Sequence, residues 1–341
     1  MPSREFKRIS SRYLNVDFDA YFHHVYENYE KYAVIPLLLV LGAITVLGYG
    51  YVTTAEYPYV MYENGSFSFS SSDMMEKGIE FDGGTEVQAP LPEEISVLDV
   101  ERAFSERGFE ANAMTGTTGD GEMLMVEVRE EIDRDEAMEI LRDLGLELPR
   151  EEVSINTVSA SVSAAFFTQA MIAVVLAFTI MSLVIFTAFK DVTPSVAVVF
   201  AAAGDIMISL AVMYLLGIPL TLASIAALLM LIGYSVDTDI VLSARVLKKR
   251  RGSLEERIWS SVKTGITMSL GGIVGFSILY VASHLLIGAP STFSQIAAVM
   301  VIGLLADIPL TWLGNAYILK RYVEDGWQIP APQVEKVIPW T

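Results

Sequence analysis

The sequence predicts an α-helical polytopic membrane protein with six transmembrane helices and an α+β domain between the first and second of them. Three observations support this fold class. Hydrophobic residues make up 52% of the 341 residues, which is more than an ordinary soluble domain contains. Several apolar segments reach the ~20 residues that a helix needs to cross a bilayer. A strongly acidic stretch, 55–163, separates the first apolar segment from the others.

The apolar segments divide the chain into tails, spans and one inserted domain. The candidate spans cover residues 34–53, 165–189, 194–216, 220–244, 264–287 and 293–318. The expected parts are an N-terminal tail (1–33), a first transmembrane helix (34–54), an α+β domain (55–163), a bundle of the remaining spans (164–319) and a C-terminal tail (320–341).

Lysine and arginine set the expected orientation in the cell membrane. They concentrate in both tails and in segment 245–263 between the fourth and fifth spans. With six spans, these three regions lie on one side, and the positive-inside rule makes that side the cytoplasm. We therefore expect a multi-pass protein of the cytoplasmic membrane with both termini inside and the acidic domain outside.

The acidity of the chain belongs to one domain. Residues 55–163 hold 26 of the 41 acidic residues but 7 of the 23 basic ones, a net of −19, and the rest of the chain carries +1 of the total net charge of −18. Such a domain repels the phosphates of nucleic acid, and no nucleic-acid partner is expected. A solvated acidic face is the ordinary explanation.

Alternating patterns in this domain predict a ferredoxin-like fold. In chain order we expect a strand from Ile79 to Gln88, a helix over 93–107, a strand around 123–127 after a turn-rich stretch, a helix over 133–144 and a last strand over 153–158. With one more strand before the turn-rich stretch, to which no residues are assigned, the order is β-α-β-β-α-β, that of the split βαβ motif. Gly83 and Gly84 lack the lysine of a phosphate loop and indicate a tight bend.

Aromatic residues precede the first span at helical spacing. Phe18, Phe22 and Tyr26 recur every four residues within segment 13–32. This pattern suits an amphipathic helix lying at the cytoplasmic membrane surface. It equally suits a short helix packed on a cytoplasmic loop.

Nothing in the sequence predicts an enzyme. The chain has no cysteine, its three histidines are scattered, and we find no nucleophile beside a base and no metalloprotease or phosphate-loop motif. We expect no cofactor and no metal site.

The carboxylates inside the apolar segments are the candidate functional residues. Asp237 and Asp239 lie in the fourth span, Asp205 in the third and Asp307 in the sixth. An ionisable group in a membrane helix costs roughly 2.5–3.5 kcal/mol on insertion scales, so it usually serves ion or proton movement. Helical spacing points Asp237 and Asp239 about 200° apart.

Two interpretations of these carboxylates stay open. They either relay protons, with Arg245 tuning their charge, or they form structural hydrogen bonds between helices. Arg245 begins a basic run, and the ordinary explanation of such a run is a membrane anchor on the positive side.

Two motifs resemble those of a known family. Ile79-Glu-Phe-Asp-Gly-Gly-Thr85 contains Phe81, Gly83 and Gly84 directly before an expected strand, and Gly233-Tyr-Ser-Val-Asp-Thr-Asp239 contains Gly233, Tyr234 and Ser235 in the fourth span. With the layout of one span, one large domain and five further spans, they resemble the SecF protein-export membrane proteins. These form part of the SecD/SecF family in the RND superfamily, and the fourth-span motif resembles its archaeal form.

The resemblance implies a function and partners. RND transporters have twelve spans, so this chain would be one half, with SecD as the other. The pair would work with the Sec translocation channel and use the proton gradient to draw exported polypeptides across the lipid membrane. In bacterial members the motif aspartate falls opposite Thr238, so either neighbouring aspartate could hold the proton role. The alternatives are an RND-type exporter of small molecules or lipids, and a passive membrane scaffold for the translocon.

Overall fold

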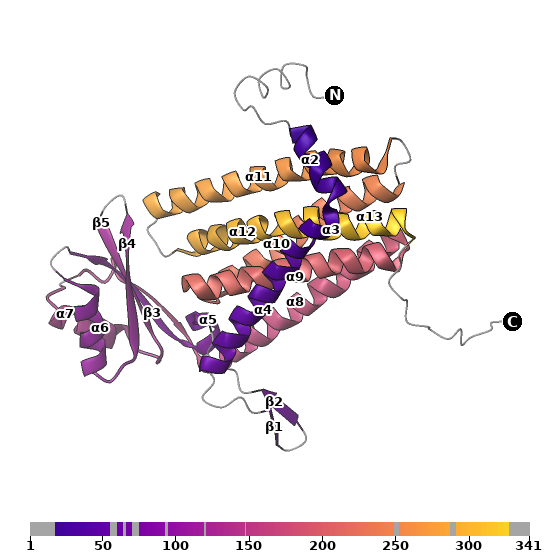
Figure 1. Cartoon of the computed structure of the whole chain (residues 1–341). Coiled ribbons are helices and arrows are strands. Elements are labelled where there is room, and N and C mark those ends of the chain that lie inside the picture. The colour runs from indigo at the N-terminus through magenta and orange to yellow at the C-terminus, as the bar shows by residue number, and fades with distance from the viewer. Residues whose placement is uncertain are drawn as a thin grey trace, which may run out of the picture.

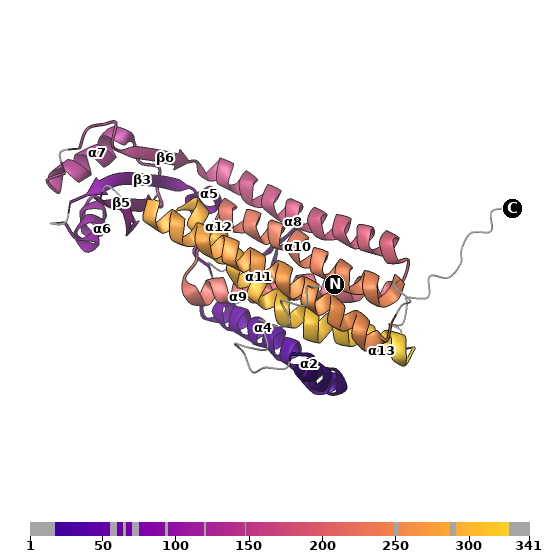
Figure 2. The same ribbon diagram turned by 90° about the horizontal axis from the view of Figure 1, so that it is seen from above.

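The computed structural model describes residues 18–54, 60–63, 66–69, 75–92, 95–118, 121–146, 148–248, 252–286 and 291–326. A bundle of long helices forms one part, and a small α+β domain lies against one end of it (Figures 1 and 2). The described ends of the chain, α2 and α13, lie toward the opposite end of the bundle. The side of the membrane that each end faces remains a prediction.

The described ranges contain six helices that are long and apolar enough to cross a membrane, as the sequence predicts. Their regular parts are α4 (Val34–Thr54), α8 (Ala160–Phe189), α9 (Val192–Leu216), α10 (Leu222–Ser243), α11 (Leu254–Leu286) and α12 (Thr292–Pro309). Short π-helical segments extend two of them: η1 (Ala244–Lys248) follows α10, and η2 (Leu310–Asn315) joins α12 to α13 (Ala316–Glu324).

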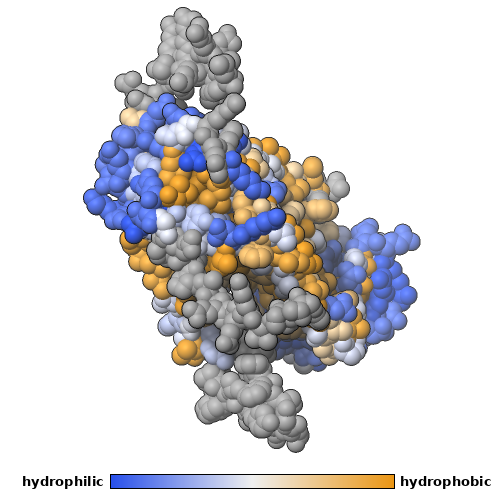
Figure 3. Space-filling model, turned by 90° about the vertical axis from the view of Figure 1, so that its right-hand side faces the viewer, coloured by the Kyte–Doolittle hydropathy of each residue, from blue (hydrophilic) through white to orange (hydrophobic). Residues whose placement is uncertain are grey.

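The helices divide into an inner and an outer group. In the most apolar 18-residue stretches of α9, α10 and α12, 50–56% of the stretch is buried inside the protein, whereas in those of α4, α8 and α11 the buried share is 11–22%. The outer helices therefore expose leucine, valine and isoleucine along the flanks of the bundle (Figure 3). A flank of this kind is stable in lipid and would aggregate in water.

The α+β domain has the predicted ferredoxin-like topology. Its elements are β3 (Gly84–Leu91), α6 (Val97–Glu106), β4 (Ala111–Thr118), β5 (Gly121–Val128), α7 (Arg134–Asp143) and β6 (Ser154–Val158). The strands are ordered β4-β5-β3-β6, and every neighbouring pair is antiparallel. One face of the sheet buries Val87 and Val126 against Phe104 and Leu141 of the two helices.

The prediction of a strand beginning at Ile79 is wrong. Ile79–Asp82 is a one-turn helix, α5, and β3 begins only at Gly84. Ile79 and Phe81 are both buried, but Phe81 packs into the bundle against Ala170 and Ile225 rather than in the sheet. The short apolar alternation therefore arose from one helical turn docked on membrane helices. A second difference is a hairpin of β1 (Val60–Glu63) and β2 (Ser66–Phe69), which the sequence did not indicate.

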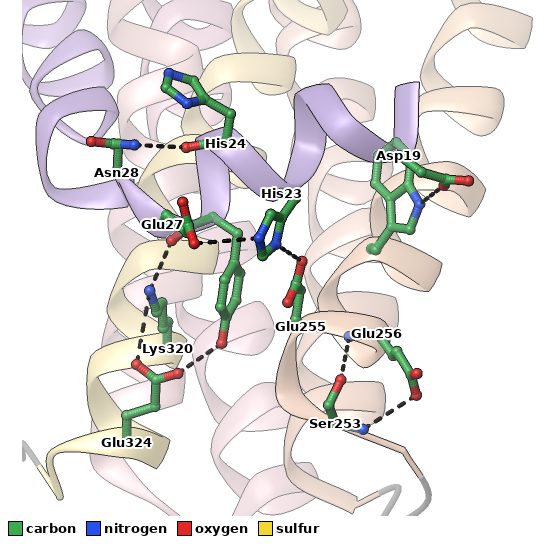
Figure 4. A network of polar contacts seen from close by, with 12 residues as sticks. Asp19, His23, His24, Glu27, Asn28, Ser253, Glu255, Glu256, Lys320 and Glu324 are labelled. Atoms are coloured by element: carbon green, nitrogen blue, oxygen red, sulfur yellow. Dashed lines mark hydrogen bonds and ion pairs between the residues drawn. The ribbon is translucent and has the colours of Figure 1, made fainter. Parts of the chain in front are cut away.

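The aromatic segment before the first span forms α2 (Phe18–Glu27) and α3 (Tyr29–Tyr32). Phe22 stacks on Trp259 of α11 with ring centroids 4.4 Å apart, and Tyr29 is buried. Polar contacts join the same helices to α11 and α13, including His23 Nδ1 to Glu255 at 2.7 Å (Figure 4). The structure therefore favours packing on the bundle over lying only on lipid; residues 13–17 of the predicted stripe lie outside the described ranges.

Candidate functional site: a buried carboxylate cluster

Three aspartates from the inner helices are completely buried. Asp205 lies on α9, Asp239 on α10 and Asp307 on α12, and each has 0% of its surface exposed. The three helices pack against one another, which brings the carboxylates into one cluster between them. None of the ion pairs among the described residues involves these three side chains.

Hydroxyl and amide groups supply the hydrogen bonds of the cluster. Ser235 Oγ donates to Asp205 Oδ2 at 2.6 Å, and Asn315 Nδ2 donates to Asp239 Oδ1 at 2.7 Å. The Thr311 hydroxyl lies 2.9 Å from Asp307 Oδ1 and 3.1 Å from Asp239 Oδ1. One threonine links two carboxylates, so the cluster is a connected network across α10 and the α12–η2 helix.

The cluster has more acceptors than donors. A hydroxyl carries one proton, so Thr311 can donate to only one of the two carboxylates at a time. Thr238 Oγ1 is 3.3 Å from Asp307 Oδ2 but 2.7 Å from the carbonyl oxygen of Ser235, which competes for the same proton. Within the described part of the chain, Oδ1 of Asp205 and Oδ2 of Asp239 have no hydrogen-bond partner. A proton added to one carboxyl group would supply a missing donor, so this arrangement is suited to binding protons.

A π-helical segment positions two of the donors. Pro309 has no backbone N–H, so it cannot make the usual helical hydrogen bond, and the chain continues as η2 from Leu310. Thr311 and Asn315 both lie in η2, four and eight residues after Asp307. The sequence analysis missed both residues, although a proline two residues after an intramembrane aspartate was a usable signal.

Apolar layers close the cluster at both ends. Toward the α+β domain, Leu231, Met300 and Leu304 are 0% exposed. Toward the other end, Leu242 is 0% and Trp312 is 4% exposed.

The other predicted relay residues lie apart from the cluster. Asp237 is exposed on the opposite side of α10 from Asp239, as the helical spacing predicts. Arg245 donates to Ser260 Oγ at 3.0 Å and to Thr264 Oγ1 at 2.9 Å on α11, and none of the ion pairs among the described residues includes it. Of the predicted relay residues, the structure thus brings together Asp205, Asp239 and Asp307.

The residues of the fourth-span motif have separate positions. Ser235 belongs to the cluster, whereas the Tyr234 hydroxyl donates to the carbonyl oxygen of Met268 on α11 at 3.2 Å. Gly233 is exposed beside Asp237, with nothing within 4 Å of the place where a Cβ would stand.

The glycine motif joins the α+β domain to the bundle. Phe81 packs edge-on against Phe167 of α8, with ring centroids 5.8 Å apart. Gly83 has a φ of +85° and Gly84 a φ of +127°, and a Cβ on Gly84 would lie 2.2 Å from the carbonyl oxygen of Val128. The glycines therefore allow a sharp change of direction from α5 into the sheet, directly on the membrane helices.

Backbone hydrogen bonds strengthen this joint. The amide of Gly78 donates to the carbonyl oxygen of Leu220 at 3.0 Å. The amide of Leu220 donates in turn to the carbonyl oxygen of Glu76 at 2.7 Å. Ser163 Oγ of α8 donates to the carbonyl oxygen of Ile79 at 3.1 Å. The domain is therefore attached to the start of α10 as well as to α8.

Comparison with known proteins places the chain in a family. Residues 140–325 match the family "Protein export membrane protein SecD/SecF, C-terminal". The chain is 52% identical over 148 residues to a "Protein-export membrane protein SecF" of Methanothermobacter thermautotrophicus, a match that spans 43% of this chain and 52% of that protein. It is 36% identical to the protein of the same name from Methanocaldococcus jannaschii over 73% of this chain and 88% of the relative.

A solved structure agrees in fold. The crystal structure of SecDF from Thermus thermophilus, described as a translocon-associated membrane protein, superposes with a TM-score of 0.63 at 19% identity. The match covers 93% of this chain but 41% of that one, so the chain corresponds to less than half of the solved protein. With these matches, its spans and its motifs, the chain belongs to the SecD/SecF family of protein-export membrane proteins, among the SecF members.

Proposed function

We propose that this chain is the subunit that works with SecD at the Sec translocation channel and uses the proton gradient to promote export of polypeptides. Its family supports a role in the Sec machinery. The observation that carries the proton part is the buried cluster of Asp205, Asp239 and Asp307, which has too few hydrogen-bond donors for its acceptors. The role is that of a transport accessory rather than an enzyme.

Protonation would change how the inner helices pack. A carboxylate only accepts hydrogen bonds, whereas a carboxylic acid also donates one. Each proton therefore changes whether the Thr311 hydroxyl donates to Asp239 or to Asp307. Because the members of the cluster lie on α9, α10 and α12, a change of partners alters the fit between these helices. A proton that crosses 100 mV releases about 2.3 kcal/mol, which is enough to shift a balance between two packings.

The joint at the glycine motif would pass such a movement to the α+β domain. The start of α10 is hydrogen-bonded to residues 76–78, and Phe81 packs against Ile225 of α10. A displacement of α10 therefore moves the base of the domain. We propose that the domain faces the outside of the cell membrane and there assists the exported polypeptide, while the basic segment around Arg245 faces the cytoplasm.

The open side of α10 is where we place SecD. Leu222, Ala226, Met230, Gly233 and Asp237 are exposed on this helix at spacings of three or four residues. A carboxylate facing lipid at this depth is costly, so a polar partner helix is needed to cover Asp237. Gly233 leaves room for that helix to approach closely.

Cross-linking tests this placement, because the chain contains no cysteine of its own. A cysteine at Gly233 should cross-link to SecD carrying a cysteine on the facing helix. A cysteine at Leu183 of α8, which is 62% exposed, serves as the comparison. Efficient cross-linking from Leu183 with none from Gly233 would show that SecD lies elsewhere.

Proton flux tests the function itself. The chain and SecD are reconstituted in liposomes with a pH-sensitive dye inside, and the variants Asp205→Asn, Asp239→Asn and Asp307→Asn are compared with Asp133→Asn. The N-cap residue Asp133 of α7 lies in the α+β domain, and asparagine caps a helix equally well. We expect flux to fall at least about tenfold in the cluster variants and to be retained in the control.

Flux that is unchanged in all three cluster variants would contradict the proposal. Equal export with and without a proton gradient would instead indicate a passive scaffold. Asp237→Asn separates the two carboxylates of the fourth span: we expect it to weaken association with SecD, whereas Asp239→Asn should abolish flux within an intact complex.

A further inference from the structure

A cavity of about 330 Å³ lies between the α+β domain and the ends of two membrane helices. Glu80, Glu86 and Glu127 line it from the domain, and Thr221, Phe293 and Gln295 line it from the starts of α10 and α12. Figure 2 shows β3 and β5 next to the ends of these helices. The cavity is separate from the buried aspartates, since the layer of Leu231, Met300 and Leu304 lies between them.

Two of these glutamates face each other across neighbouring strands. Glu86 of β3 and Glu127 of β5 are directly paired in the register of the sheet, and both side chains are half-buried. Like charges in directly opposite positions destabilise a sheet. Their other register neighbours, Asn112 on β4 and Asn156 on β6, carry no charge, and Gln88 donates a hydrogen bond to Glu86.

Among the described residues that line the cavity, the remaining charged group is also acidic. Glu80 and Glu76, at and before α5, raise the negative potential, whereas α10 and α12 line the cavity with uncharged groups. The nearby ammonium group of Lys77 pairs with Asp82 at 3.2 Å and does not line the cavity. His284 of α11 lines a separate cavity against Met114 of β4. Burial, and then the charges of Glu86, Glu80 and Glu76, raise the pKa of Glu127 to about 7, and burial raises that of Glu86.

We propose that Glu86 and Glu127 form a proton-binding site outside the membrane-spanning segments, and that protonation there closes the α+β domain onto the ends of α10 and α12. When both groups are charged, they repel each other and require water, which keeps the cavity open. With a shared proton, the same face can pack its methionines, Met123 and Met125, against Phe293. The chain joins the domain to the bundle through 75–83 and through the β6–α8 junction, and the proposed closure is a rotation about these two connections that also changes the packing of β4 on α11.

The absence of cysteine from the chain permits a direct test. Spin labels are placed on cysteines at Glu106 of α6 and Leu285 of α11, both of which are exposed. The distance between the labels is measured from about pH 5 to about pH 9 in the full chain in lipid nanodiscs. We expect a shorter distance at acid pH, with a midpoint near pH 7 and a change of about tenfold in the closed-to-open ratio per pH unit.

Two sets of variants decide the outcome. The Glu86→Gln/Glu127→Gln variant should keep the acid-state distance at every pH, whereas Glu122→Gln, an exposed position on the same strand, should behave like the parent chain. A distance that does not change with pH in the parent chain, or a pH response that persists in the double variant, would overturn the proposal.

Infrared spectroscopy decides the case in which the double variant does not fold. In the chain with Asp205, Asp239 and Asp307 changed to asparagine, the carboxylic acid band that titrates near pH 7 should disappear when Glu127→Gln is added, and its persistence would overturn the proposal. The inference does not rest on the proton-driven function, because a chain with Asp205, Asp239 and Asp307 all changed to asparagine should retain the pH-dependent distance. Loss of the response in that chain would assign it to the buried cluster instead.

Discussion

Glycines on α11 provide a prediction in which one substitution should destabilise the chain and two neighbouring ones should not. A Cβ on Gly265 would lie 2.0 Å from Cζ2 of Trp312 and 2.6 Å from its Cη2. The indole is rigid, 4% exposed and packed in a cluster with Leu242 and Ile258, so it cannot move without disturbing its neighbours. Gly271 and Gly275 of the same helix have nothing within 4 Å of such a Cβ.

These clearances set the expected magnitudes. Overpacking a filled core costs about 1–3 kcal/mol, and a rigid ring at 2.0 Å belongs at the upper end. Alanine in place of glycine returns about 1 kcal/mol of helix propensity. We therefore expect Gly265→Ala to lower the free energy of unfolding by about 2 kcal/mol, and Gly271→Ala and Gly275→Ala to raise it by up to about 1 kcal/mol.

The assay is unfolding in detergent micelles with increasing dodecyl sulfate, followed by the helical circular dichroism signal. The comparison between variants of one helix removes the uncertainty of the unfolded reference state. Equal midpoints for Gly265→Ala and Gly271→Ala would mean that the Trp312 ring is not packed against α11 at Gly265, contrary to this prediction. Trp312 follows Thr311 directly, so the same result would weaken the geometry of the carboxylate cluster.

Three further predictions concern the α+β domain and the N-terminal helix. Gly84→Ala should unfold the domain, at a cost of at least about 3 kcal/mol, because its Cβ meets the carbonyl oxygen of Val128 at a positive φ; limited proteolysis measures this, and a protease-resistant variant would contradict it. The pKa of Glu127 is raised from 4.5 to about 7, so its contribution to the free energy of unfolding is complete below about pH 4.5 and is lost as the pH rises through 7. Glu127→Gln should remove this pH dependence, which amounts to at most about 3 kcal/mol and is reduced by solvent screening of the partly exposed carboxylate. An unchanged pH profile in chemical denaturation would count against this prediction. Phe22→Ala should release α2 from the bundle and expose it to protease, since deleting a buried phenylalanine costs about 3–5 kcal/mol, whereas Tyr21→Ala, at a side chain 63% exposed, should leave the cleavage rate unchanged.

The membrane spans were predictable because bilayer thickness imposes a long apolar run on each of them. The ends of the helices were not, because helices continue beyond the apolar run. The fifth span was expected from residue 264, but α11 begins at Leu254 and includes the charged positions Glu255 and Arg257. A hydropathy pattern marks only the part of a helix that must be apolar.

The ferredoxin-like domain was predictable from the order of its alternating and helical patterns. The mistake at Ile79 arose because one helical turn and a short strand can both place apolar residues two positions apart. The helical turn at Ile79 is favoured over a strand because it places Phe81 against the bundle, and the sequence of the domain alone does not contain that information.

The sequence identified Asp205, Asp239 and Asp307 as candidate residues but did not predict that they form one cluster. It separated Asp237 from Asp239, because helical spacing puts the two on different faces. It could not unite Asp239 with Asp205 and Asp307, since that requires knowing that α9, α10 and α12 are the inner helices. Asn315 contacts Asp239 through a π-helical segment, and such segments shift the helical spacing on which the prediction relied.

Infrared titration of the reconstituted chain shows whether the buried aspartates bind and release protons. Difference spectra between acid and alkaline pH should contain the carbonyl stretching band of a protonated carboxylic acid in a dry environment. We expect each of Asp205→Asn, Asp239→Asn and Asp307→Asn to remove part of this band, and the triple variant to remove the whole contribution of the cluster. A spectrum in which none of the three substitutions changes the band, at any accessible pH, would contradict the account.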